Sequence, residues 1–85
     1  MKDIIWQPRA RRQLKKIKGA KTRADILAAV KTLREFPDVP EVKALVNHQY
    51  THRLKVGTHR VLFNAFEEIN IITIEEVKKR NERTY

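Results

Sequence analysis

The segment from residue 51 to residue 64 constrains the fold more than any other part of the chain. Residues 51–56 and 59–64 are rich in strand-forming side chains at alternating positions, and only Gly57 and Thr58 separate them. A glycine at the first of two turn positions fits a type II′ hairpin. Counting outward from that turn predicts four cross-strand pairs: Val56 with His59, Lys55 with Arg60, Leu54 with Val61, and Arg53 with Leu62.

The predicted register gathers basic side chains on one face of the hairpin. Because side chains alternate along a strand, Leu54 and Val61 share one face, and Arg53, Lys55 and Arg60 share the other. Like charges directly opposite one another destabilise a ladder, so the pairing of Lys55 with Arg60 indicates a bound anion, and phosphate suits that geometry. The alternative is a solvated face on which the long side chains point apart.

Composition favours the anion site. The chain of 85 residues is long enough for one small domain, and 19 Lys and Arg against 10 Asp and Glu give a net charge of +9. Such an excess predicts a polyanionic partner, nucleic acid in preference to a membrane. No apolar run approaches the roughly 20 residues of a membrane span, and no signal-peptide pattern is present. We therefore expect a cytoplasmic protein that makes no membrane contact.

Metal and disulfide chemistry are not expected. The chain has no cysteine, which excludes disulfides and thiolate metal ligands. Its three histidines lack a metal-binding spacing. We therefore expect no metal and no cofactor.

The N-terminal half reads as a strand followed by two helices. Residues 4–6 are a short strand, and Pro8 begins a helix that Gly19 ends. Thr22 is the expected N-cap of a second helix, which ends just before Pro37.

The C-terminal half supplies the rest of the sheet. Residues 38–48 are expected to be a loop, residues 69–74 a buried strand, and residues 78–85 a charged tail with a short helical turn. The sequence thus predicts one α+β domain over residues 1–85. Two N-terminal helices pack on a mainly antiparallel four-stranded sheet in the order β-α-α-β-β-β.

Three segments resemble one protein family over nearly the whole chain. Residues 5–10 read IWQPRA, similar to a first strand that enters a helix of the form x-P-x-A. Residues 53–63 read RLKVGTHRVLF, similar to a hairpin of the form YRLRVGDYRVLY, and residues 77–85 read VKKRNERTY, similar to a V-x-K-R…Y close. The chain therefore resembles the RelE/ParE toxin superfamily of bacterial type II toxin–antitoxin systems, in its RelE-like branch.

This resemblance implies an endoribonuclease that cuts messenger RNA in the ribosomal A site without a metal. The ribose 2′-OH attacks the adjacent phosphate, which requires a base, positive charge on the phosphorane and an acid for the leaving oxygen. Carried over by motif, Lys55 is the base or charge stabiliser, Arg53 clamps phosphate, and Arg60 stabilises the transition state. Arg80 is the proton donor or a second clamp, and Tyr85 stacks on a base or orients the phosphate. Arg80 and Tyr85 are one residue closer than in that branch, which weakens the assignment of Tyr85.

Other residues are candidates for weaker roles. An ordinary histidine titrates nearer neutral pH than an ordinary lysine, so His59 beside the turn is a possible catalytic residue, whereas His52 and His48 read as surface or loop positions. Trp6, Phe36, Phe63 and Phe66 are expected in the core. Density of charge alone supports phosphate contact, which adds a set of RNA-binding candidates: Arg53, Lys78, Lys79, Arg83, Arg11, Arg12 and Lys15. The helical members of this set fit either an ordinary solvated face or a platform for ribosomal RNA, and the charge of +9 favours the platform.

Two functions other than the nuclease stay open. The resemblance implies partners for the nuclease. The same scaffold serves ParE-like inhibitors of DNA gyrase, which cut no RNA, and a non-catalytic basic module would bind RNA or protein only. For the nuclease, the expected partners are the ribosome, messenger RNA and a cognate antitoxin protein. Operator DNA would be bound only through the antitoxin.

Overall fold

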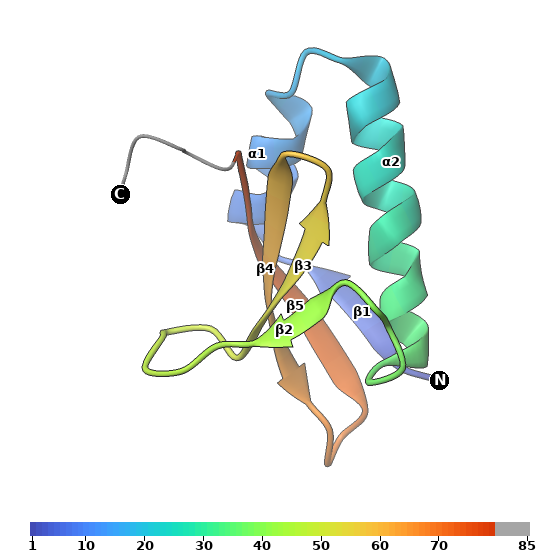
Figure 1. Ribbon diagram of the computed structural model, residues 1–85, viewed down its shortest axis with the longest axis vertical. Coiled ribbons are helices and arrows are strands. Elements are labelled where there is room, and N and C mark those ends of the chain that lie inside the picture. The colour runs from blue at the N-terminus through green and yellow to red at the C-terminus, as the bar shows by residue number, and fades with distance from the viewer. Residues whose placement is uncertain (80–85) are drawn as a thin grey trace.

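The computed structural model describes residues 1–79, which form a five-stranded sheet with two helices packed against it (Figure 1). The strand order is β1-β5-β4-β3-β2, in which β1 pairs parallel with β5 and every other pair is antiparallel. The elements are β1 (Asp3–Trp6), α1 (Pro8–Lys15), α2 (Ala20–Lys31), the 3₁₀ helix η1 (Thr32–Glu35), β2 (Val42–Ala44), β3 (His52–Val56), β4 (His59–Phe66) and β5 (Ile71–Lys79). The α+β class and the two N-terminal helices are confirmed.

The hydrophobic core lies between the helices and one face of the sheet. Helix α2 and η1 bury side chains at helical spacing, namely Ile26, Val30 and Leu33. The sheet contributes alternate residues of three strands: Leu54 of β3, Val61 and Phe63 of β4, and Ile72, Ile74 and Val77 of β5. This arrangement leaves the opposite face of β3, β4 and β5 free for polar side chains.

The hairpin forms as predicted. Lys55 pairs with Arg60, and Leu54 pairs with Val61. Gly57 has φ of +57°, whereas Thr58 does not adopt positive φ, which is the pattern of a type II′ turn. Leu54 and Val61 are buried, so the basic side chains occupy the other face.

The second helix begins earlier than predicted. Gly19, expected to end the first helix, is the N-cap of α2, and its carbonyl accepts a hydrogen bond from the Arg23 N–H at 3.0 Å. The proposed cap residue Thr22 therefore lies inside the first turn. The helical segment continues through η1 to Glu35, in agreement with a stop just before Pro37.

The sheet differs from the prediction in the two strands that flank the hairpin, one on each side of it. Residues 42–44, expected to be loop, form β2 and pair with β3, so the sheet has five strands and not four. A three-residue strand carries too little periodicity to be recognised, and it forms because β3 offers it a free edge. Strand β5 extends to Lys79, beyond the predicted end at Ile74, because β4 supplies partners as far as His59.

Strand β5 contains a β-bulge. Leu62 pairs with Glu76 but its neighbour Phe63 pairs with Ile74, which leaves Glu75 as an extra residue. A one-residue insertion exchanges the two faces of a strand. Consequently Ile74 and Val77 both face the core, although they are three residues apart.

The aromatic residues follow the prediction with one exception. Phe36 and Phe63 are buried and Trp6 packs against the core, but Phe66 is 45% exposed at the end of β4. The expectation for Phe66 is wrong because β4 alternates, which directs this side chain away from the helices. His52, expected at the surface, instead packs against the rings of Phe36 and Phe63, with centroid distances of 5.0 and 5.4 Å.

No helix within residues 1–79 is long and apolar enough to cross a membrane. None of the described residues forms a group of three His, Asp or Glu side chains suited to a metal ion.

The packing of His52 predicts an acid-sensitive stability. Burial lowers the pKa of His52 below its ordinary value of 6.5, and the charge of Glu67 offsets this only in part. The unfolded chain therefore binds the proton more tightly, so the free energy of unfolding falls as the pH drops below about 6.5. Urea unfolding at about pH 7.5 and about pH 5 measures the fall in the free energy of unfolding. In the His52→Phe variant this fall should be smaller, because the contribution of His52 is absent. An equal loss in both proteins over this range would contradict the prediction.

Candidate functional site

The three basic residues of the hairpin line one hollow. Arg53, Lys55 and Arg60 surround a cavity of about 180 Å³ together with Gly57 and His59 at the turn. Arg53 and Arg60 are half-buried, and Lys55 is exposed. None of the three basic side chains is ion-paired with a carboxylate from residues 1–79. The hollow therefore presents uncompensated positive charge, which suits a phosphate.

Lys78 extends this basic surface across the sheet. Lys55 of β3 pairs with Arg60 of β4, and Arg60 pairs with Lys78 of β5, so three cations form one row across three strands. Lys78 belongs to this face only because the bulge at Glu75 shifts the alternation of β5. Lys79, also a predicted RNA-binding residue, faces the opposite side of the sheet.

A buried carboxylate lies beside this row. Glu76 is 6% exposed, and its Oε2 accepts a hydrogen bond from the Tyr50 hydroxyl at 2.7 Å. Its Oε1 accepts a hydrogen bond from Gln13 Nε2 at 3.3 Å. Two cations complete the group, with Arg9 3.6 Å from Oε2 and Lys78 3.7 Å from Oε1. Sequence reasoning did not identify the burial of Glu76, because its partners Tyr50 and Gln13 lie far from it along the chain.

These contacts keep Glu76 ionised. Burial by itself raises the pKa of Glu76, but the hydrogen bonds from Tyr50 and Gln13 and the charges of Lys78 and Arg9 outweigh it, so the pKa lies below its ordinary value of 4.5. The same bond to Glu76, with burial, raises the pKa of Tyr50. A fixed negative charge therefore sits inside the basic face at neutral pH.

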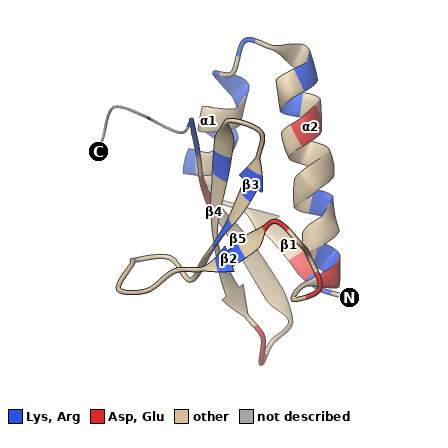
Figure 2. Ribbon diagram, in the orientation of Figure 1, with Lys and Arg blue, Asp and Glu red and all other residues tan. Residues whose placement is uncertain are grey.

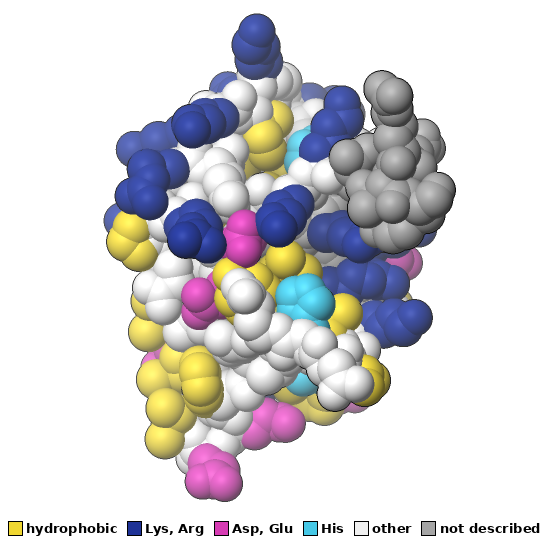
Figure 3. Space-filling view, turned by 90° about the vertical axis from the view of Figure 1, so that its left-hand side faces the viewer, with side chains coloured by type: hydrophobic (Ala, Val, Ile, Leu, Met, Phe, Trp, Pro, Cys, Tyr) yellow, Lys and Arg dark blue, Asp and Glu magenta, His cyan; other side chains and the backbone are white. Residues whose placement is uncertain are grey.

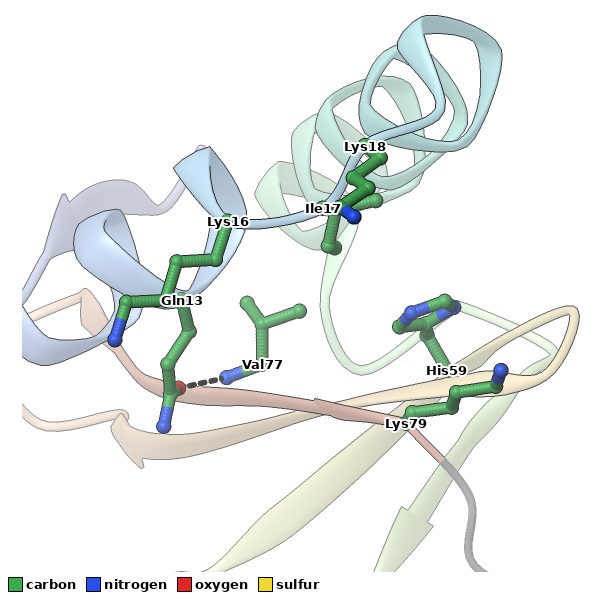
Figure 4. A pocket seen from close by; sticks show the side chains of 7 residues that line it. All are labelled: Gln13, Lys16, Ile17, Lys18, His59, Val77 and Lys79. Carbon is green, nitrogen blue, oxygen red and sulfur yellow. Dashed lines mark hydrogen bonds between the residues drawn. The ribbon is translucent and has the colours of Figure 1, made fainter.

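A second cavity lies on the helical side of the sheet, below the connection between α1 and α2 (Figure 4). It measures about 410 Å³, and Ile17 and Val77 form part of its wall, with lysines around them. Gln13 closes the edge of β5 there, because its Oε1 accepts the Val77 N–H at 2.6 Å. His59 lines both this cavity and the hairpin hollow, and its ring lies on the helical side of the sheet, the side of Ile17 and Val77 (Figure 4).

The basic residues of α1 add to one end of the molecule. Arg11, Arg12 and Lys15 are exposed on α1, and Figure 3 shows Lys and Arg crowding the upper half of the face that lies to the left in Figure 1. In Figure 2 acidic positions mark the turn between β4 and β5 at the other end. Arg80, Arg83 and Tyr85 lie outside the described residues, so their predicted roles stay predictions.

Solved structures with the same architecture are toxins. The chain matches the isolated RelE toxin of E. coli with a TM-score of 0.80 and 15% identity, over 99% of this chain and 89% of that one. It matches the archaeal RelE–RelB complex from Pyrococcus horikoshii with a TM-score of 0.78 and 18% identity, over 95% and 97%. The toxin–antitoxin complex RelBE2 from Mycobacterium tuberculosis gives a TM-score of 0.67 and 27% identity, over 93% and 98%. The fold is therefore that of the RelE-like toxins.

The sequence places the chain within this class. A sequence model of the ParE toxin of the type II toxin–antitoxin system parDE matches residues 4–84. The chain belongs to this family, inside the RelE/ParE superfamily, and is a toxin of a type II toxin–antitoxin system. No curated protein sequence gives a significant match.

The contacts of Glu76 predict a measurable role for Tyr50. The Tyr50→Phe variant removes a hydrogen bond to a buried charged group, which should lower the free energy of unfolding by about 1.5–3 kcal/mol. Urea denaturation at neutral pH measures the difference. As a matched control, Phe66→Leu alters an exposed aromatic residue on the same face and should change the free energy of unfolding less. A Tyr50→Phe protein as stable as the parent would mean that this bond contributes nothing.

Proposed function

We propose that this toxin is an endoribonuclease that cuts messenger RNA on the ribosome. The observation that carries the proposal is the hollow formed by Arg53, Lys55 and Arg60. It is of a size to hold one phosphate, and its cations lack carboxylate partners among residues 1–79. A site that only bound a protein would not require this concentration of unpaired charge.

Each side chain of the hollow has a role in the reaction. The scissile phosphate binds between Lys55 and Arg60, and Arg60 stabilises the charge that develops on the phosphorane, joined by protonated Lys55 if Lys55 is not the base. Arg53 clamps a non-bridging oxygen, since its guanidinium stays protonated and forms paired hydrogen bonds. The base that takes the 2′-OH proton is Lys55 or His59, both of which line the hollow. Arg80 supplies the proton to the leaving oxygen, and Tyr85 orients the RNA.

Inhibition of DNA gyrase is the second candidate function. The family description names the ParE toxin, and this alternative needs no RNA cleavage. The two functions depend differently on the hairpin. Removal of one cation of the hollow should abolish the activity of a nuclease, whereas it should weaken a protein contact spread over a surface only in part.

Cleavage on translating ribosomes tests the proposal. The Arg60→Ala variant should cut a defined message about a hundred-fold more slowly than the parent, because it lacks one of the groups that stabilise the transition state. Mapping of 5′ ends along the message measures both the sites and the rate. The Arg34→Ala variant removes an equal charge from η1, away from the hollow, and should cut at the parental rate.

The same assay separates the alternatives. Intact message with inhibited DNA supercoiling would assign the gyrase function. Cutting by Arg60→Ala at the parental rate would refute the active site in the hollow.

We also propose that an antitoxin covers this basic face. We further propose that the protein is cytoplasmic, because both the antitoxin and the ribosome would be met there. Two of the three solved structures described above are toxin–antitoxin complexes, RelE with RelB and RelBE2. For a chain of charge +9, a segment with acidic and apolar residues is the complementary partner. Contact with operator DNA would then take place through the antitoxin.

Antitoxin binding should depend on salt. The dissociation constant should rise several-fold between about 0.1 M and about 0.5 M salt, because counter-ions screen the exposed cations. Titration of the toxin with antitoxin by calorimetry measures this, and a Lys55→Ala/Arg60→Ala protein should show a weaker dependence. Binding that is constant over this range would exclude the basic face from the interface.

A further inference from the structure

A buried acidic residue among RNA-binding cations requires an explanation. Glu76 is ionised, carries two hydrogen bonds and contacts two cations, yet it takes no part in the reaction proposed above. We propose that Glu76 is a positioning residue that holds Lys78 and Arg9 as a second phosphate-binding pair beside the hairpin hollow. The proposal rests on the proposed function, because it assigns this pair to the same RNA strand.

The exposure of the three side chains supports this arrangement. The side chain of Glu76 is 8% exposed, whereas those of Lys78 and Arg9 are 56% and 61% exposed. An approaching phosphate therefore meets the two cations first, and the carboxylate lies behind them. Long basic side chains lose rotamer freedom when they bind, so cations that are already held by a carboxylate bind at a lower entropic cost.

The carboxylate is itself fixed from two directions. Tyr50 holds Oε2 from the segment before β3, and Gln13 holds Oε1 from α1. Gln13 also accepts the Val77 N–H, so its amide orientation is fixed by the sheet edge. The three contacts place the carboxylate at one defined point between β5 and α1.

The pair continues the row of cations in the hollow. Lys78 is in register with Arg60, and neighbouring strands lie about 4.8 Å apart, so Lys78 is one strand beyond the proposed scissile phosphate. Arg9 lies on α1, on the far side of Glu76. The cations thus form a track from β3 across β5 to α1, which suits successive phosphates of one single strand.

Glu76 is not itself suited to be the base in this reaction. Both of its oxygens are engaged by donors or cations, and the side chain is nearly inaccessible to a ribose hydroxyl. Its effect on RNA must therefore pass through Lys78 and Arg9.

The Glu76→Gln variant gives a test in which two explanations predict opposite changes in RNA affinity. If Glu76 only weakens the positive potential, its neutralisation adds one positive charge and tightens RNA binding. If Glu76 positions the pair, RNA binding weakens despite the added charge. Glu75→Gln is the matched control, because Glu75 contacts Gln7 and Thr73 and neither cation of the pair.

The measurement is binding of a 2′-O-methyl RNA oligonucleotide, which cannot be cut, by fluorescence anisotropy at several salt concentrations. Each phosphate contact contributes about 0.7 to the slope of log K against log salt for a single strand. Lys78→Ala should lower the slope by about 0.7, and Glu76→Gln should lower it by up to about 1.4 and weaken binding. Glu75→Gln should bind as tightly as the parent or more tightly.

A double variant and a folding control keep the test decisive. Glu76→Gln should have little further effect on the slope in a Lys78→Ala/Arg9→Ala background, where there is nothing left to position. Thermal unfolding by circular dichroism shows whether Glu76→Gln folds. If it does not fold, Tyr50→Phe, which keeps every charge, takes its place and should also weaken RNA binding. Binding that is tighter in Glu76→Gln, or equal in all the variants, would overturn the proposal.

The result is independent of the cleavage assay. If the parent cuts message but Glu76→Gln binds RNA like Glu75→Gln, the second phosphate pair is wrong and the nuclease stands. If the parent cuts no message but the slopes change as expected, the pair stands and the nuclease is wrong.

Discussion

The extra residue in β5 determines which side chains reach the basic face. Before the bulge, Ile72 and Ile74 face the core, and after it Val77 does. If the same sequence ran as a regular strand with no bulge, Glu76 and Lys78 would point into the core and Val77 would be exposed, at the cost of burying two charged groups away from water. Core packing and the charge of the open face therefore depend on the same irregularity of the backbone.

The distribution of charge follows from this arrangement. The row Lys55, Arg60 and Lys78 would be unfavourable in isolation, and it is tolerated because its members are exposed or half-buried and because Glu76 supplies a nearby negative charge. The acidic turn between β4 and β5 lies at the opposite end of the molecule (Figure 2). The resulting asymmetry orients the hairpin end towards an approaching polyanion.

Local chemistry predicted those parts of the fold that depend on neighbouring residues. Gly57 alone identified the turn, and counting from it gave the register of β3 with β4 correctly. The strand β2 was not predictable because three residues carry too little periodicity, and the bulge at Glu75 was not predictable because it depends on the register of β5 against β4. The same limit applies to the site: the hollow was predicted from the hairpin, but the contacts of Glu76 require Tyr50 and Gln13, which only the tertiary fold brings to it.

The parallel pairing of β1 with β5 has a consequence for synthesis of the toxin. Asp3 is the partner of Ile71, so the first strand has no place in the sheet until nearly the whole described chain has left the ribosome. Contacts between such distant segments slow folding, because the long intervening loop must close before they are formed. A nascent toxin of this topology cannot complete its sheet early in translation, so β1 takes its place in the sheet only after residues 71–74 have been synthesised.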